Sequence, residues 1–101
     1  MAMDAQRMGA ADQRLQETLR NASLRLNLHR GSFPYGRAYG SRLHALDRGG
    51  EHAEEQAVAL ANEALLDLEG VTANSAEVSE EGIRFSIETA FGAGEVLYGE
   101  L

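Results

Sequence analysis

The sequence predicts an α+β domain in which two helices pack on a small antiparallel sheet built around a C-terminal β-hairpin. Two observations support this fold class. Apolar residues recur with helical spacing in two segments before Gly70, and after Gly70 they alternate with polar residues. The chain has 101 residues, which is enough for one domain with a small core. We therefore expect a flexible N-terminal segment over residues 1–10 and a single domain over residues 11–101.

The first helix is expected over residues 11–28. Asp12 is a suitable N-cap, and Gly31 with Pro34 prevents the helix from continuing far beyond this range. Its apolar residues recur at intervals of four, three and four positions and therefore share one face. They are Leu15, Leu19, Ala22 and Leu26.

The second helix is expected over residues 51–68. Three acidic residues in its first turn, Glu51, Glu54 and Glu55, complement the positive end of the helix dipole, and Gly70 provides the stop. A broad apolar face runs along the segment, made of Ala57, Leu60, Ala61, Ala64, Leu65 and Leu68. Both helices therefore have an apolar face to bury.

The C-terminal third predicts a β-hairpin. Ile83, Phe85 and Ile87 alternate with polar residues, which is the pattern of a half-buried strand. A weaker strand over residues 72–78 precedes it, and residues 79–82 form the turn. Val96, Leu97 and Tyr98 form either a third short strand or an unpaired tail, and the sequence leaves these alternatives open.

Charge is divided unevenly along the chain. Residues 1–48 contain eight arginines and four acidic residues, whereas residues 49–101 contain Arg84 and twelve acidic residues. Such a chain could associate head to tail, or its two halves could attract each other within one fold. Lysine is absent. No segment is apolar enough for a signal or a membrane span, so we expect a protein that is cytoplasmic on synthesis.

Few residue patterns point to catalysis or to a cofactor. The chain has no cysteine, which excludes disulfides and thiolate metal sites. The closest pairing of candidate metal ligands is His52 with Glu55, and one such pair does not make a di-metal site. We therefore predict no enzyme activity, no metal and no cofactor. Nucleic acid is disfavoured because the acidic half would repel phosphate.

The segment from Arg30 to Leu43, RGSFPYGRAYGSRL, holds three of the six aromatic residues and three arginines. Arginine, tyrosine and phenylalanine are enriched in the centres of protein interfaces. The aromatic residues could instead cap the small core, and the two interpretations are compatible. Our candidate interface residues are Arg30, Phe33, Pro34, Tyr35, Arg37, Tyr39 and Arg42 in this segment, with Ile83, Phe85 and Ile87 in the hairpin.

The order of these elements, with Gly31, Pro34, the motif Tyr39-Gly40-Ser41-x-Leu43 and the hairpin strand EGIRFSIET, resembles the baseplate-wedge or sheath-initiator proteins of contractile phage tails and related injection systems, the gpW-type tail proteins. The resemblance covers residues 12–91. The sequence departs from the family pattern after Gly31, where Ser32 and Phe33 replace an acidic residue and arginine.

The resemblance implies a non-enzymatic structural subunit that is assembled into a phage tail or phage-like particle and seeds the sheath. Its partners would be sheath or other baseplate subunits, with self-association in a ring as a further possibility, and neither nucleic acid nor membrane. Residues 71–101 contain no lysine or proline, the residues that commonly protect sheet edges, so we expect a partner strand to add to the strand from Ile83 to Thr89. The alternative occupant of this edge is the chain's own tail over residues 91–101, which would fold back and close the edge itself. The alternative function is a free-standing adaptor or regulatory domain that binds a protein at the same edge.

Overall fold

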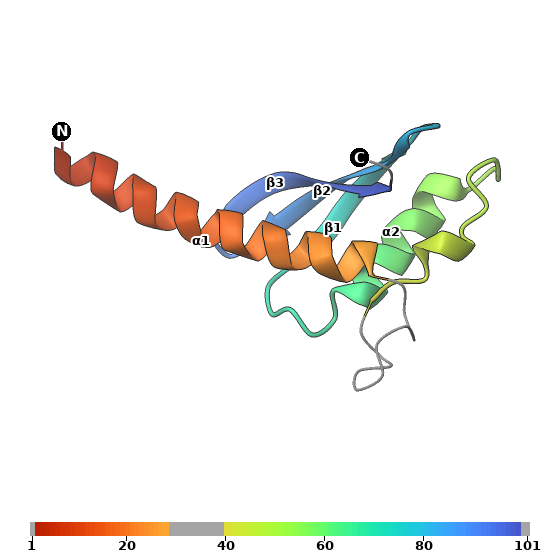
Figure 1. The fold of residues 1–101 in the computed structure, drawn as a ribbon, viewed down its shortest axis with the longest axis horizontal. Helices are drawn as coiled ribbons and strands as arrows, with labels where there is room; N and C mark the ends of the chain where they lie inside the picture. The colour runs from red at the N-terminus through yellow and green to blue at the C-terminus, as the bar shows by residue number, and fades with distance from the viewer. Residues whose placement is uncertain (1, 29–39, 100–101) are drawn as a thin grey trace.

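The computed structural model describes residues 2–28 and 40–99, with the backbone alone for residues 2–11. Its elements in chain order are α1 (Ala2–Asn27), the short 3₁₀ helix η1 (Leu43–Ala45), α2 (Ala53–Ala64), β1 (Thr72–Val78), β2 (Gly82–Thr89) and β3 (Gly92–Gly99). The strands form one antiparallel sheet in the order β1-β2-β3. Helix α1 lies along β3 and α2 along β1 (Figure 1). The predicted α+β fold is confirmed.

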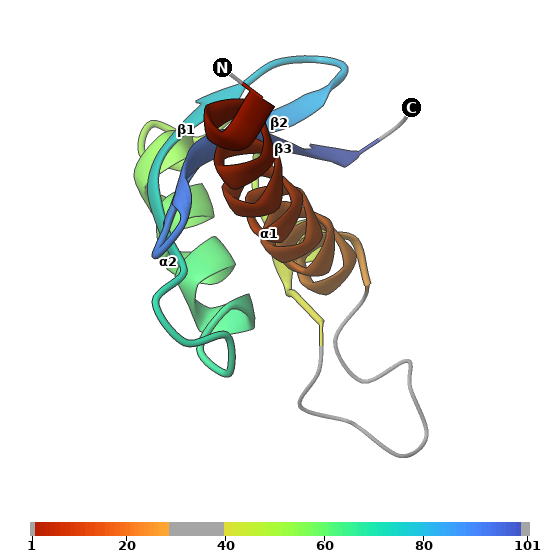
Figure 2. The same cartoon turned by 90° about the vertical axis from the view of Figure 1, so that its left-hand side faces the viewer.

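Helix α1 is longer than predicted, because its backbone is helical from Ala2 onward. Residues 2–10, expected to form a flexible segment, include three alanines, two methionines, Gln6 and Arg7, all of which favour helix. A helix of this length extends about 39 Å, whereas an eight-residue strand extends about 26 Å. The N-terminal part of α1 therefore projects beyond the sheet, as Figure 1 shows. Figure 2 views the helix nearly along its axis, with its N-terminus toward the viewer. No helix in the described part of the chain is long and apolar enough to cross a membrane.

Helix α2 is shorter than predicted and ends at Ala64. The chain then turns, because the N–H of Leu68 donates to the carbonyl of Leu65 at 2.9 Å and the N–H of Val71 to that of Leu68 at 3.3 Å. Gly70 has a φ of 74°, which glycine adopts without steric cost. The turn reverses the chain so that β1 can run back along α2. It leaves the side chain of Leu65 buried and that of Leu66 82% exposed.

The predicted hairpin is present and is extended by a third strand. Residues Val96–Tyr98 belong to β3, which pairs with β2 from Gly92 to Gly99, so the unpaired-tail alternative is wrong. The pairing of β1 with β2 has an irregularity between Ala73 and Ser75. Strand β2 is thus the central strand, with a neighbour on each side.

The core lies between the helices and one face of the sheet. The sheet contributes Ile83, Phe85 and Ile87, each 0% exposed, together with Val96 and Tyr98. The helices contribute Ala22, Leu26, Ala57, Ala61 and Ala64. Helical alanines let α2 approach the sheet closely enough for large β2 side chains to fill the space between them.

Ser41 fastens the chain after residues 29–39 to the end of α1. Its N–H donates to the carbonyl of Leu28 at 2.7 Å, and its buried hydroxyl donates to that of Leu26 at 2.6 Å. The last carbonyls of a helix have no partner within the helix, so Ser41 satisfies groups that would otherwise be unpaired. Gly40, with a φ of 95°, makes the approach, and Leu43 enters the core. These three residues of the motif Tyr39-Gly40-Ser41-x-Leu43 thus have structural roles.

Two glycines permit close approach of backbones. A Cβ at Gly82 would overlap the carbonyl oxygen of Tyr98 on β3, and Gly82 is paired with another glycine, Gly99. A Cβ at Gly94 would lie 2.5 Å from Cδ1 of Leu19, so α1 rests directly on the backbone of β3. The close approach of β3 to β2, and of α1 to β3, is therefore possible because Gly82 and Gly94 have no side chain.

We expect Gly82→Ala to lower the free energy of unfolding by about 1–3 kcal/mol, because the methyl group meets backbone that cannot move independently of the sheet. The matched control is Gly49→Ala, whose Cβ would meet Asp47 Oδ1 at an ordinary 3.7 Å. The control should stay within about 0.5 kcal/mol of wild type. Urea denaturation followed by circular dichroism measures both, and equal stabilities would contradict the packing described.

Candidate protein-binding edge

Only some of the predicted interface residues lie in the described part of the chain. Six of them are outside it: Arg30, Phe33, Pro34, Tyr35, Arg37 and Tyr39. Ile83, Phe85 and Ile87 are described, and their side chains face the core. The expectation that they contact a partner is corrected, because β1 and β3 pair with both edges of β2 and the helices cover its apolar face.

Arg42 is on the surface and already has a partner. Its Nε donates to Oε1 of Glu63 and its Nη2 to Oε2, both at 2.8 Å. This hydrogen bonding, with the charge of Glu63, raises the pKa of Arg42 above its usual value. The pair links the start of η1 to α2, beside a hollow of ≈ 390 Å³ lined partly by Leu46 and Leu60. Arg42 therefore positions these elements in the isolated chain.

The outer edge of β1 is held by side chains of α2. Asn62 Nδ2 donates to the carbonyl of Ala73 at 3.0 Å, and Asn62 Oδ1 accepts from the N–H of the same residue at 2.8 Å. Glu54 Oε2 accepts from the N–H of Val78 at 3.2 Å. Since Ala73 and Val78 lie near opposite ends of β1, this edge is occupied at both ends.

Among the described residues, side chains hold the outer edge of β3 at one end only. Asn27, the last residue of α1, donates from Nδ2 to the carbonyl of Leu97 at 3.0 Å, and its Oδ1 accepts from the N–H of Gly99 at 3.1 Å. Backbone groups of alternate residues in an antiparallel strand face the same side. The N–H and C=O groups of Ala93 and Glu95 therefore also face outward, away from β2.

A groove lies beside the middle of β3, at Glu95, Val96 and Leu97. It has a volume of ≈ 270 Å³ and lies between α1 and β3, lined by Gln16, Leu19, Arg20, Ser23, Glu95, Val96 and Leu97. Leu19 supplies apolar surface to its lining, and Arg20 and Glu95 supply charges. Outward-facing strand groups next to such a groove are features that can bind an extended peptide by strand addition.

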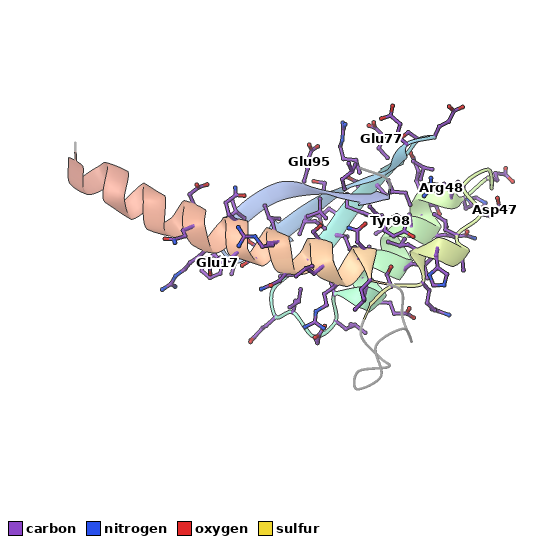
Figure 3. The ribbon with its side chains drawn as sticks, in the orientation of Figure 1. Glu17, Asp47, Arg48, Glu77, Glu95 and Tyr98 are labelled. Carbon is purple, nitrogen blue, oxygen red and sulfur yellow. The ribbon has the colours of Figure 1, made fainter. Side chains whose placement is uncertain are left out.

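The face of the sheet that points away from the helices is polar. Figure 3 shows Glu77 and Glu95 projecting from this face, whereas Tyr98 lies between the sheet and the helices. Arg84 lies on β2, directly opposite Glu77 in the register.

At the turn between β2 and β3, the guanidinium of Arg14 lies 5.8 Å from the ring centre of Phe91. This cation–π contact links α1 to the hairpin tip.

The described residues contain no group of three or more histidine, cysteine, aspartate or glutamate side chains that could hold a metal ion. His52 Nδ1 lies 3.6 Å from Oε1 of Glu55, and both side chains are exposed. The pair noted in the sequence is therefore real in space, and it lies at the start of α2.

Neither Asn27 nor Asn62 was predicted from the sequence to hold a strand edge. An asparagine at the end of a helix is ordinary, and the partners of Asn27 lie 70 and 72 positions further along the chain.

A scan against models of known protein families and searches of curated proteins and of solved structures find no significant match to this chain.

We expect Asn62→Ala to lower the free energy of unfolding by about 1–3 kcal/mol, because the buried N–H and C=O of Ala73 would lose both partners. Asn21→Ala is the control, since Asn21 is exposed on α1 and gains the same helix propensity on substitution. Chemical denaturation should place this control within about 0.5 kcal/mol of wild type. A loss in both variants, or in neither, would show that the contacts of Asn62 do not stabilise β1.

Proposed function

We propose that this chain is a non-enzymatic structural subunit of a phage-like contractile tail baseplate, and that it binds a neighbouring sheath or baseplate subunit at the open half of the β3 edge. The observation that carries the binding role is the pair of outward-facing backbone units of Ala93 and Glu95 beside the groove on α1. The tail role rests on the motif Tyr39-Gly40-Ser41-x-Leu43 and on the order of the elements.

The geometry of the edge favours one kind of ligand. An extended segment paired with Ala93 and Glu95 would place alternate side chains over the groove and over the open sheet face. On the groove side they would meet Leu19, which favours an apolar residue. On the open face they would meet Glu95, which favours arginine or lysine. The proposed partner is therefore an extended segment with alternating apolar and basic residues.

The segment of residues 29–39 offers a second contact region. Its arginine and aromatic composition is that of an interface centre. The interface role of Arg30, Phe33, Pro34, Tyr35, Arg37 and Tyr39 stays a prediction. A free-standing adaptor domain would use the same β3 edge, and the experiment below separates it from a tail subunit.

Deleting the gene from a strain that produces the particle should abolish sheathed tails in electron micrographs, because the sheath would lack its first contact. Complementation with wild type should restore them, and Glu95→Ala should restore them in part, because it loses only the charge contact, whereas Glu95→Pro should not restore them. Proline removes the outward N–H at this position but breaks no bond to β2. Circular dichroism of purified Glu95→Pro checks that the fold is intact.

The outcomes distinguish the two parts of the proposal. Normal sheathed tails after deletion would refute the tail role and favour the adaptor. Restoration by Glu95→Pro as fully as by Glu95→Ala would refute pairing at β3 and leave the tail role standing.

A further inference from the structure

Each helix contributes one asparagine that binds outward-facing backbone of an edge strand. Asn62 of α2 binds both backbone groups of Ala73 on β1, and Asn27 of α1 binds the carbonyl of Leu97 and the N–H of Gly99 on β3. A side-chain amide has the same donor and acceptor as a peptide unit. Each asparagine therefore occupies the place that the backbone of an added strand would take.

We propose that Asn27 guards the β3 edge against pairing with a second copy of the chain. Its amide is fixed from its own helix, because Nδ2 also donates to the carbonyl of Ser23 at 2.9 Å. The amide is thus held against β3, and both its nitrogen and its oxygen form hydrogen bonds. An incoming strand must displace it to pair with Leu97 or Gly99.

The guarded half is the half of β3 that would favour self-pairing. Leu97 is 42% exposed, although it lies on the otherwise polar face of the sheet. With Asn27 removed, two copies could pair antiparallel with their Leu97 side chains in contact, and apolar cross-strand pairs stabilise such ladders. The edge would then offer outward groups from Ala93 to Gly99.

With Asn27 in place, two copies can pair only through Ala93 and Glu95. In that register Ala93 of each copy pairs with Glu95 of the other. The two Glu95 carboxylates then lie on the same face of the joined sheet in neighbouring residue pairs, where like charges repel. Asn27 therefore disfavours self-pairing at one half of the β3 edge, and Glu95 disfavours it at the other half. A foreign basic segment is not subject to the charge repulsion, so the guard restricts self-pairing and leaves the open half available to a partner. This inference stands independently of the tail role.

The test compares the molar mass of purified variants by size-exclusion chromatography with light scattering over a concentration series. Wild type and the control Asn21→Ala should remain monomeric. Asn27→Ala should shift toward twice the monomer mass as concentration rises, and Asn27→Leu, which keeps the branched shape of the side chain but removes both of its polar atoms, should do the same. The double variant Asn27→Ala with Glu95→Pro should return to the monomer mass, because proline removes a donor from the exposed edge.

Circular dichroism on each sample establishes that the variants are folded. If Asn27→Ala fails to fold, Asn27→Leu carries the test. Monomeric, folded Asn27 variants at the highest concentration would overturn the proposal. So would association of wild type itself, or association of the double variant to the same extent as Asn27→Ala, since the contact would then lie elsewhere.

Discussion

The packing of α1 along β3 is the contact on which the rest of this structure depends. Leu19 rests on the backbone of Gly94, Asn27 binds the end of the strand, and Arg14 lies over Phe91 at the hairpin tip. These contacts join the first and last elements of the chain. They close the core over β2 and β3, and they determine which part of the outer edge of β3 is covered. A helix shifted by one turn would cover a different part of the edge.

The two sheet edges are unequal because the two helices end differently relative to the strands. Helix α2 forms side-chain hydrogen bonds with both ends of the β1 edge, through Asn62 and Glu54. Among the described residues, α1 forms them only with the C-terminal end of the β3 edge, through Asn27, and its N-terminal part projects past the sheet (Figure 1). Residues 71–101 contain no lysine and no proline, so the usual edge protectors are absent. Side-chain hydrogen bonds from the helices take over that role, and those between described residues leave one short stretch uncovered.

The sequence predicted the elements that periodicity specifies. The alternation around Ile83, Phe85 and Ile87 located β2, and the apolar stripe through Leu19 and Leu26 located α1. Periodicity does not tell which edge of a strand is paired, so the sequence could not decide whether a partner strand or the chain's own tail pairs with β2. Residues 92–99 pair there as β3, and strand addition to β2 is therefore excluded. The sequence left a third strand undecided because the glycines of residues 92–99 interrupt the alternation of apolar and polar residues. Those glycines allow α1 and β2 to approach β3 closely. The hydrogen bonds of Asn27 and Asn62 join residues far apart in sequence and leave no local signal.

Backbone amide hydrogen exchange, followed residue by residue by NMR on the isolated chain, tests the central claim that β3 is open in one half and closed in the other. The amides of Val96, bonded to β2, and of Gly99, bonded to Asn27, should exchange slowly, whereas those of Ala93 and Glu95 should exchange at rates close to those of an unfolded peptide. Equal protection of Glu95 and Val96 would contradict the account, as would exchange of Gly99 as fast as that of Glu95.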